Sequence, residues 1–484
     1  MKISAITPML KEMKEFDYDV AVVGGGSGGY AAARTAANAG LRTVVVEGGK
    51  EVAGLCILRG CMPTKALLYA AEVKHLAQHP DAWGIHSQNV GFDFAKVMAR
   101  KNAQIRSFAD YRELQLTEAT FKFIRAQARF TGKHTLALST GETLTAKNFV
   151  ISTGSLVAPP PLPFLNDITH LTSDEALELT RLPKSLIILG GGSVGVEFAQ
   201  IFARFDVKVT LIQRSPYVLH EFDIDATDEL EKVFRREGMT VFTNTKLTGA
   251  SQKGGLKRIT FLHEAREIAV EAEEVLYALG RIPNTASLGL ENAGVNTENG
   301  RIITNDEMQT SAKHIYAAGD CTSPYEIVHL AVLQGEVAGC NIAQPHHQRR
   351  MDYRLLTSVV FTEPQLAKVG LTEKEALLRN IPYLAASYPF ADHGKSLIME
   401  AKDGFVKLLA DPATGEIIGG CCVGPHGGEL IHEIITAMYK RMTVQELAAM
   451  PHYHPTLAEI WTYPAEELAT EVAARAAHEG KGHG

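Results

Sequence analysis

The sequence predicts an α/β protein with a duplicated β-α-β unit, followed by a smaller domain that has its own sheet. A glycine-rich strand, turn, helix and strand pattern begins near residue 18, and the same pattern returns near residue 185. Beyond residue 352, alternating apolar runs flank DPATGE, a hairpin turn signal. The length of 484 residues and the 45% hydrophobic content are typical of a globular enzyme with several domains.

Composition and charge narrow the class of protein further. The net charge of −7 is spread without a long run of like charge, which argues against a nucleic-acid surface. The opening segment MKISAITPMLKEMKEF is a poor export signal, and no apolar stretch of 18 residues follows, so we expect a cytoplasmic protein without a membrane partner. Six cysteines are too few for a disulfide scaffold in a chain of this length.

The first β-α-β unit, in DYDVAVVGGGSGGYAAARTAANAGLRTVVVEGG, predicts a dinucleotide site. Gly24, Gly26 and Gly29 form the GxGxxG pattern, which permits a tight turn and close approach of a pyrophosphate to the helix N-terminus. Glu47 ends the second strand 23 residues after Gly24, where a carboxylate can accept hydrogen bonds from ribose hydroxyls.

The second unit, in KSLIILGGGSVGVEFAQIFARFDVKVTLIQRS, predicts a second nucleotide site. Gly190, Gly192 and Gly195 repeat the pattern, but Gln213 stands where the first unit has a glutamate, and Arg214 follows it. Neutral and cationic groups suit a 2′-phosphate better than a carboxylate does. The sequence therefore favours NADPH at this site, with NADH left open.

Other loops at strand ends are candidates for ligand contacts, because open parallel sheets bind ligands there. A small polar turn follows the strand run NFVIS, and a proline-rich segment after it predicts a domain boundary near residue 158. Further on, EEVLYALGRIPNT and SAKHIYAAGDC each end a strand in a glycine turn. The candidate residues are Thr153, Gly154, Ser155, Gly280 and Asp320.

Two cysteines stand close together in GLCILRGCMPTK, and a redox-active dithiol, a structural disulfide and a metal clip all use such a pair. Cys56 and Cys61 are five residues apart, so a bond between them needs a distorted turn, which Gly54 and Gly60 would permit. Pro63 suits the first turn of a following helix, whose N-terminus would lower a thiol pKa. No second cysteine pair of suitable spacing supplies metal ligands, so the redox reading is favoured and no metal is expected.

Taken in order, the two GxGxxG units, Cys-x4-Cys, ALGRIPN, IYAAGD and HPTLAE resemble the FAD-dependent pyridine nucleotide-disulfide oxidoreductases, from about residue 17 to 465. The resemblance implies two Rossmann-like dinucleotide-binding domains and a C-terminal α+β dimerisation domain. The first loop with Glu47 would hold FAD, Asp320 would contact its ribitol chain, and the second loop would hold NADP or NAD. The expected domains are residues 17–158 and 285–350 for FAD, 159–284 for NAD(P), 351–466 for the subunit interface, and 467–484 as a tail.

The resemblance also implies the catalytic residues and a homodimer. His454, oriented by Glu459 five residues later, would move a proton at the partner subunit's disulfide. Without its neighbours, His454 with His452 could equally be a metal pair or polar loop residues. Cys61 would exchange electrons with the flavin and Cys56 would exchange with the substrate. Lys65 and Glu197 would pair beside the flavin and nicotinamide.

The branch within the family is less clear from the sequence. His329, six residues before Gly335, stands where dihydrolipoamide dehydrogenases tend to carry histidine, which favours a lipoyl substrate. Gln213 and the motif GLCILRGCMPTK depart from their usual pattern, which leaves the substrate and the nucleotide open. Glutathione or mercuric reductase-like enzymes, and a diaphorase passing electrons directly from flavin to quinones or metals, are the alternatives, whereas a non-catalytic subunit is disfavoured. The final EVAARAAHEGKGHG carries no cysteine pair and is expected to be disordered. Direction, partner complex and pathway stay open.

Overall fold

The computed structural model describes residues 15–322 and 324–481, so nearly all of the segment judged a poor export signal and the last three tail residues lie outside it. The described chain divides into two compact units. Unit 1 contains the residues up to Cys56, Phe108–Leu156 and Ile282–Met351. Unit 2 contains Ile57–Ser107, Val157–Arg281 and the residues from Asp352 onward. Across the described ranges, no helix combines the length and apolar character needed to cross a bilayer.

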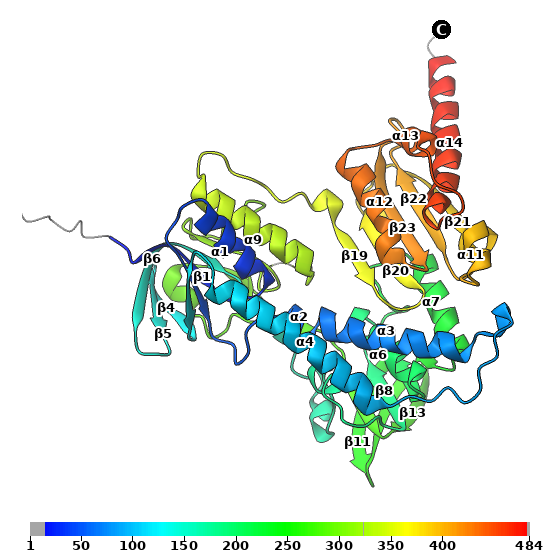
Figure 1. The fold of residues 1–484 in the computed structure, drawn as a ribbon, viewed down its shortest axis with the longest axis horizontal. Helices are drawn as coiled ribbons and strands as arrows, with labels where there is room; N and C mark the ends of the chain where they lie inside the picture. The colour runs from blue at the N-terminus through cyan, green and yellow to red at the C-terminus, as the bar shows by residue number, and fades with distance from the viewer. Residues whose placement is uncertain (1–14, 323, 482–484) are drawn as a thin grey trace, which may run out of the picture. The chain divides into compact units, whose positions relative to one another are not determined.

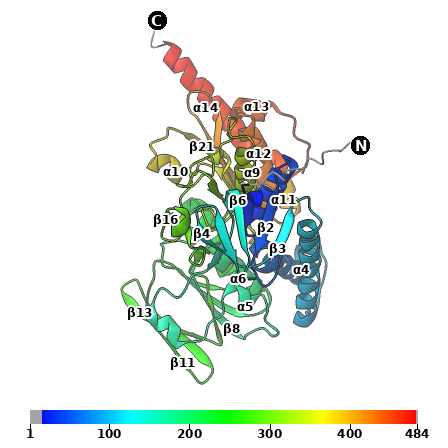
Figure 2. The same cartoon turned by 90° about the vertical axis from the view of Figure 1, so that its left-hand side faces the viewer.

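Unit 1 is built on a seven-stranded sheet in the order β3-β2-β1-β6-β5-β4, with β18 pairing to β6 (Figures 1 and 2). Its central strands pair in parallel and carry apolar side chains that are almost fully buried, as expected of a parallel sheet covered on both faces. The strands are β1 (Tyr18–Val23), β2 (Thr43–Glu47), β3 (Lys122–Arg125), β4 (Ala128–Gly132), β5 (Thr135–Leu138), β6 (Thr143–Ile151) and β18 (Ile315–Ala317).

Two helices of unit 1, α1 (Ser27–Asn38) and α9 (Val328–Ala343), lie side by side (Figure 1). The contact is close because small residues face each other: a β-carbon added to Gly335 would lie 2.1 Å from the carbonyl oxygen of Gly28. The shorter elements of the unit are α8 (Leu290–Ala293), β16 (Thr297–Glu298) and β17 (Arg301–Ile302). The chain passes between the units within α2 (Leu55–Arg59) and α4 (Phe94–Thr117), and again near β7 (Ser155–Val157) and β15 (Arg281–Pro283).

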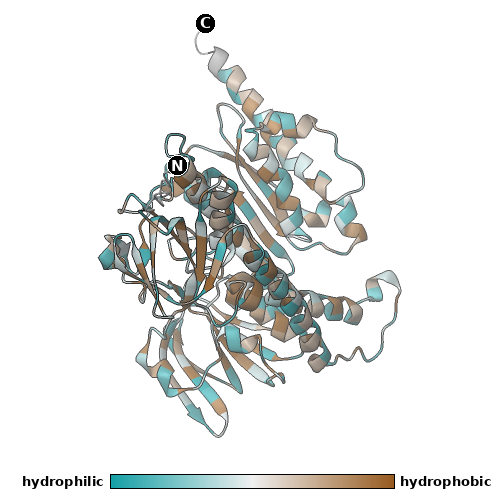
Figure 3. Cartoon of the chain, turned by 60° about the vertical axis from the view of Figure 1, so that its left-hand side comes forward, coloured by the Kyte–Doolittle hydropathy of each residue, from teal (hydrophilic) through white to brown (hydrophobic). Residues whose placement is uncertain are grey.

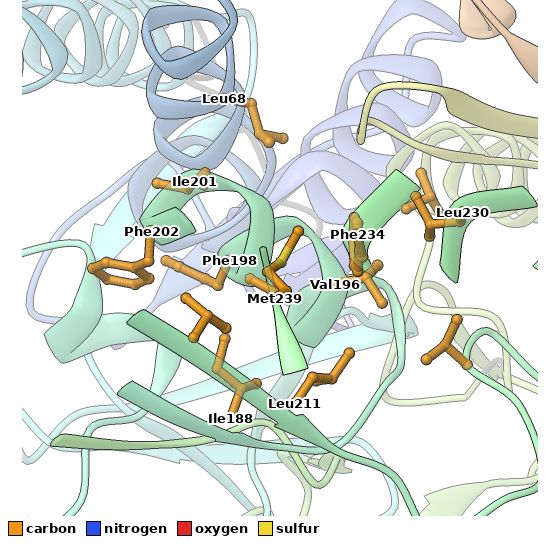
Figure 4. Close-up of a cluster of buried hydrophobic side chains, with 14 of the residues drawn as sticks. Leu68, Ile188, Val196, Phe198, Ile201, Phe202, Leu211, Leu230, Phe234 and Met239 are labelled. Carbon is orange, nitrogen blue, oxygen red and sulfur yellow. The ribbon is translucent and has the colours of Figure 1, made fainter. Parts of the chain in front are cut away.

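Unit 2 repeats the glycine-loop architecture in a four-stranded parallel sheet of order β10-β9-β8-β14. Figure 4 shows the apolar cluster that packs helices onto this sheet, with Phe198 and Phe202 above Ile188 and Leu211. The elements are β8 (Ser185–Leu189), α6 (Ser193–Arg204), β9 (Lys208–Ile212), α7 (Ile224–Arg236), β10 (Thr240–Phe242) and β14 (Glu274–Tyr277), with α3 (Cys61–Gln78) packed on α6. An antiparallel sheet of β11 (Lys246–Lys253), β12 (Leu256–His263) and β13 (Arg266–Ala272) extends it, and η2 (Pro163–Asp167) contacts β11. The remaining short elements are η1 (Asp81–Trp83) and α5 (Ser173–Ala176).

The second sheet-containing part of unit 2 is antiparallel, in the order β19-β20-β23-β22-β21. As predicted, the turn DPATGE joins the neighbouring strands β22 and β23. The strands are β19 (Thr357–Val360), β20 (Gln365–Gly370), β21 (Leu384–Pro389), β22 (Phe405–Ala410) and β23 (Ile417–Gly424). The helices are η3 (Tyr353–Leu355), α10 (Glu373–Leu378), η4 (Phe390–Asp392), α11 (Gly394–Ile398), α12 (Gly427–Tyr439), α13 (Val444–Ala449), η5 (Ala458–Trp461) and α14 (Thr462–Lys481).

The prediction of a disordered tail was wrong for its described part. Helix α14 continues to Lys481, because Leu468 and Val472 are buried in the core and anchor its first turns. The exposed end is rich in alanine, which favours helix, and Glu471 and Arg475 form an ion pair there at 3.0 Å.

The structure confirms the α/β class with a duplicated nucleotide-binding architecture and a C-terminal sheet domain. Figure 3 shows that the inner strands of the sheets are strongly apolar, whereas the helices carry both apolar and polar residues. This is the hydropathy pattern of helices that cover a buried sheet. The predicted boundaries at residues 158, 284 and 350 remain predictions.

Candidate active site

The first glycine loop of unit 1 connects β1 to α1 in a conformation that only glycine adopts readily. Gly24 has a φ of 103°, and a β-carbon there would lie 2.3 Å from the carbonyl oxygen of Ser152. A β-carbon at Gly29 would lie 1.9 Å from the carbonyl oxygen of Gly24. At Gly26 the nearest atom would be 3.8 Å away, so this glycine leaves open space at the N-terminus of α1.

Glu47 closes the loop from the end of β2. Its two carboxylate oxygens accept hydrogen bonds from the backbone N–H groups of Gly25 and Gly49, both at 2.6 Å. The carboxylate thus holds the glycine loop in place, a structural role that the sequence reasoning missed. Each oxygen keeps lone-pair capacity for a further donor, so the predicted ribose contact stays a prediction.

The second glycine loop, in unit 2, repeats this geometry. Gly190 has a φ of 106° and faces the carbonyl oxygen of Ala278, which a β-carbon would approach to 2.3 Å, and Gly195 again has no room for one. Gly192, like Gly26, opens onto free space. The side-chain oxygen of Gln213 accepts from the N–H of Gly191 at 3.0 Å, the contact that Glu47 makes in the first loop.

Three further predicted contacts flank the two loops. Arg214 is exposed, immediately after the buried Gln213. Gly280 has a φ of 117° and no heavy atom within 4 Å of where a β-carbon would be, so the chain turns there beside open space. His329 lies exposed in the first turn of α9.

Asp320 and the turn after β6 meet within unit 1. The hydroxyl of Ser155 donates to the Asp320 carboxylate at 2.7 Å, although the two residues are 165 positions apart in the sequence. Gly154 has a φ of 71°, which turns the chain between Thr153 and Ser155. The hydroxyl oxygen of Thr153 is buried and has no hydrogen-bond partner among the described residues. An unsatisfied buried hydroxyl of this kind fits a polar ligand group.

The cysteine pair lies on two successive helical segments. Cys56 is in α2 and Cys61 is the first residue of α3, and both are partly buried. Gly60 breaks the helix between them with φ −134° and ψ −115°, and Gly54 precedes them with a φ of 78°. The predicted distortion and the predicted helix N-terminus are therefore present. The 18-residue helix α3 points its positive end at Cys61, which favours a thiolate there.

Three of the other described cysteines contrast with this pair, whereas the fourth, Cys340, is partly buried. Burial raises the pKa of Cys321 to about 11 and that of Cys421 to about 12, and it raises the pKa of Cys422 well above its ordinary value. Thiols of this kind are inert packing groups. They offer no competing dithiol of redox character.

Lys65 and Glu197 form an ion pair within unit 2, joining α3 to α6. The Lys65 ammonium lies 2.8 and 3.0 Å from the two carboxylate oxygens, and the Glu197 side chain is only 5% exposed. Glu197 also accepts from the N–H of Phe361 at 3.0 Å, and the Lys65 ammonium lies 4.7 Å from the centre of the Phe361 ring. Phe361 was not predicted, since nothing in its local sequence signals this contact.

The two histidines of PHYHP have different surroundings. His454 Nδ1 donates to Glu459 at 3.0 Å, while its side chain is 79% exposed and that of Glu459 only 12%. His452 is buried, with its Nε2 2.6 Å from Glu433 and its Nδ1 3.0 Å from the carbonyl oxygen of Met450. The structure thus makes His452 a packing residue and leaves the other ring nitrogen of His454 facing outward.

One cationic residue near the site escaped the sequence reasoning. The Arg112 guanidinium lies 4.4 Å from the centre of the Tyr30 ring and close enough to Cys56 to interact with its charge. Its Nε and Nη1 atoms are buried without a hydrogen-bond partner in the described part of the chain, and burial lowers the pKa of Arg112. Helix α4 carries three arginines along a polar sequence, so no sequence pattern singles out this position.

The glycine loops, cysteine pair and His–Glu pair define a dinucleotide-dependent thiol enzyme, and comparison with known proteins gives the family. Residues 18–335 match the pyridine nucleotide-disulphide oxidoreductase family, and residues 356–465 match its dimerisation domain. The chain belongs to this family of flavin-dependent disulfide oxidoreductases. Its dimerisation domain supports a homodimer.

Individual relatives span most of the chain. It is 37% identical to the dihydrolipoyl dehydrogenase of Thermus scotoductus, covering 93% of this chain and 97% of that one. It is 35% identical to the dihydrolipoyl dehydrogenase of Geobacillus stearothermophilus, covering 92% and 95%. A mercuric reductase of Staphylococcus aureus is 32% identical over 92% of this chain and 81% of that one.

Solved structures with this fold include LpdA from Mycobacterium tuberculosis, with a TM-score of 0.83, and the HOCl-induced flavoprotein disulfide reductase RclA from Escherichia coli, with a TM-score of 0.81. Both are 26% identical to this chain, and each match covers 93% of this chain and 99% of the other. The fold is therefore shared over nearly the whole length.

FAD and NAD(P)H are the cofactors of this family, and the residues present fit both. In unit 1, the open space at Gly26, the helix N-terminus behind it and the unsatisfied Thr153 hydroxyl suit a dinucleotide with a polar tail. In unit 2, the open space at Gly192 suits a second pyrophosphate.

Proposed function

We propose that this chain transfers electrons between NAD(P)(H) and a dithiol or disulfide substrate through the Cys56 and Cys61 pair, with a lipoyl group as the substrate. The observation that carries the proposal is the outward-facing imidazole of His454, held by the nearly buried carboxylate of Glu459. A carboxylate in this position orients an imidazole and stabilises its cationic form, as a general base at a thiol requires.

The protein's own residues account for the exchange chemistry. In the direction of disulfide reduction, the Cys56 thiolate attacks one substrate sulfur, the substrate S–S bond breaks, and the departing thiolate takes a proton from His454. The Cys61 thiolate then attacks the Cys56 sulfur, which releases the second substrate thiolate and leaves a Cys56–Cys61 disulfide. Bound FAD would supply the two electrons from NAD(P)H that restore the dithiol. Dithiol oxidation runs the same steps in reverse.

The subunit arrangement follows from the exposure of His454. An imidazole that is 79% exposed in one chain needs a second surface to exclude water from its reaction, and the dimerisation domain supports one. We therefore infer that His454 and Glu459 serve the cysteine pair of the partner subunit.

The lipoyl assignment rests on the dihydrolipoyl dehydrogenases among the relatives and on His329, exposed at the start of α9. The nucleotide assignment rests on unit 2, where Gln213 is occupied with the glycine loop and Arg214 is exposed beside it. A cation with no carboxylate beside it suits a 2′-phosphate, so we propose NADP(H), with NAD(H) as the alternative.

The test is to follow dihydrolipoamide oxidation with NADP and with NAD, together with NAD(P)H-dependent reduction of lipoamide, oxidised glutathione and Hg²⁺. We expect lipoyl turnover that is lost in Cys56→Ser and faster with the NADP pair. Activity with glutathione or Hg²⁺ alone would contradict the lipoyl substrate. Faster turnover with NAD would contradict the nucleotide assignment.

Direct electron transfer from flavin to dyes or quinones is the alternative function. The same variant separates the two, because a diaphorase needs no exchange at Cys56. Reduction of dyes alone, at an unchanged rate in Cys56→Ser, would overturn the disulfide mechanism.

A further inference from the structure

His393 is a fully buried histidine on the far side of Glu459 from His454. It lies between η4 and α11, its side chain is 0% exposed, and its Nε2 atom is 3.4 Å from Glu459 Oε1. His454 Nδ1 lies 3.0 Å from the other carboxylate oxygen, Oε2, and 3.2 Å from Oε1. The Glu459 carboxylate therefore lies between two imidazoles, one buried and one exposed.

The second ring nitrogen of His393 also has a partner, the hydroxyl group of Ser396. Nδ1 lies 2.8 Å from the hydroxyl oxygen of Ser396, which is also fully buried. Burial lowers the pKa of His393, so the ring is neutral and carries a single proton. If the hydroxyl donates to Nδ1, that proton is on Nε2 and points at Glu459.

Among the described residues, Glu459 is the acceptor closest to this proton. Nε2 is buried, and among the described residues no atom makes a hydrogen bond of good geometry with it. The separation of 3.4 Å to Glu459 is slightly long, and a small movement of the carboxylate would close it. A buried N–H group without a hydrogen-bond partner costs free energy, so a hydrogen bond from Nε2 to the Glu459 carboxylate is favoured.

Two tyrosines pack near His393, and among the described residues Glu459 is the carboxylate that pairs with it. The Tyr463 ring, from α14, stands at 80° to the imidazole with the centroids 6.4 Å apart. Tyr388, from β21, stacks on Tyr463 with the centroids 3.9 Å apart, and its hydroxyl donates to the carbonyl oxygen of Asp392. The titratable groups that act on His393 are Glu459 and, beyond it, His454.

We propose that His393 is a positioning residue for the proposed exchange reaction: it donates from Nε2 to Glu459 and holds that carboxylate where its other oxygen meets His454. The proposal rests on the proposed function and adds a residue to the His454 and Glu459 pair. His393 touches neither substrate nor cofactor in this role. It acts only through Glu459, by restricting the carboxylate and by sharing its negative charge.

The test compares His393→Leu, which removes the donor, with His393→Asn, which keeps an N–H donor. In the leucine variant we expect kcat to fall about tenfold with KM little changed, because a loosened carboxylate no longer holds the imidazole in register. The pH profile of kcat should change as well, because the Glu459 carboxylate then has one donor fewer and pairs with His454 alone. The asparagine variant should recover most of kcat and the original profile.

A second readout keeps this proposal separate from the proposed function. Histidine labelled with ¹³C at Cε1, with the His454 signal assigned through His454→Gln, reports the surroundings of that imidazole without any turnover. We expect the His454 chemical shift to change in His393→Leu and to return towards its original value in His393→Asn, whatever substrate the enzyme uses. An unchanged chemical shift with an unchanged pH profile would overturn the positioning role. Equal loss of kcat in both variants, with lower melting temperatures and no change in the His454 chemical shift, would show a merely structural histidine.

Discussion

At the scale of single residues, Glu47 and Gln213 show how one contact is kept while the charge changes. Each side-chain oxygen accepts from the second glycine of its loop, at 2.6 Å for Glu47 and 3.0 Å for Gln213. Holding the loop therefore needs only a hydrogen-bond acceptor, so the charge of this side chain can differ between the two loops. We therefore use the negative charge of Glu47 and the neutrality of Gln213 to predict which nucleotide each loop binds.

Arg112 makes a second residue-scale prediction, because a cation near Cys56 favours its thiolate. We expect Arg112→Gln to slow alkylation of Cys56 by iodoacetamide at pH 7 by about tenfold, equivalent to one unit in the pKa of the thiol. The reduced protein is alkylated, samples are quenched at successive times, and mass spectrometry of the peptide that contains Cys56 gives the alkylation rate.

Arg34 provides the matched control for this experiment. Its guanidinium lies 5.8 Å from the same Tyr30 ring, but it is half-exposed and paired with Glu336 at 2.8 Å. We expect Arg34→Gln to change the alkylation rate little. Equal effects of the two substitutions would show that Tyr30 packing, rather than the Arg112 charge, controls the thiol.

At the scale of elements, helix α3 carries a histidine that couples stability to pH. Burial, together with the nearby Arg204 charge, lowers the pKa of His75 from 6.5 to about 4. Above pH 6.5 the ring is neutral in both the folded and unfolded states. As pH falls from 6.5 to about 4, only the unfolded state binds the proton, so stability is lost across this window and no further below it.

We expect the melting temperature to fall less between pH 7 and pH 5 in His75→Gln than in the unchanged protein, by about 2–4 °C. Thermal unfolding followed by circular dichroism at several pH values measures it. His79→Gln is the control, because His79 is exposed although its ring lies only 4.4 Å from His75. The same pH dependence in all three proteins would contradict the prediction.

The elements also show how much of the secondary structure local sequence patterns can predict. The strands, the glycine loops and the helix that begins at Cys61 were predictable, because apolar runs, glycine spacing and a helix start are local signals. Helix α14 was missed because a charged, alanine-rich segment resembles a loose tail. Only the burial of Leu468 and Val472 shows that its beginning is anchored.

At the scale of the whole molecule, unit 2 joins two parts that the sequence separates into different domains. Lys407 on β22 has a side chain only 4% exposed, and its ammonium lies 2.5 Å from Asp225 near the start of α7 and 2.7 Å from Glu373 on α10. Arg236 and Asp403 make a second link, at 2.5 Å. The buried Lys407 with its several carboxylate partners is costly to separate from them, whereas the exposed Arg236 and Asp403 pair contributes little. The Lys407 contacts therefore help to join the two parts into one compact unit.

The proposed dimer gives a prediction for the assembled molecule. If each site combines Cys56 of one subunit with His454 of the other, two inactive variants can rescue each other. We expect Cys56→Ser and His454→Gln to be almost inactive alone, and co-expression in equal amounts to restore about a quarter of the original sites, because half the dimers are mixed and each has one intact site.

Lipoyl turnover of the total co-expressed protein measures this restoration, and mixed dimers selected through a different tag on each variant should show half of the original sites. Mixed dimers of Cys56→Ser with unaltered chains calibrate the activity of one intact site. Absence of any rescue in mixed dimers would place both residues of a site in one subunit.

The sequence by itself determined the duplicated nucleotide-binding architecture, the cysteine pair and the C-terminal sheet, because each depends on residues close together in the chain. The tertiary structure decided which long-range partners these residues have. It separated the buried His452 from the exposed His454, bound Gln213 to its glycine loop, and placed His393 against Glu459. Such contacts depend on how elements far apart in sequence pack, and packing leaves no local pattern from which side-chain partners can be predicted.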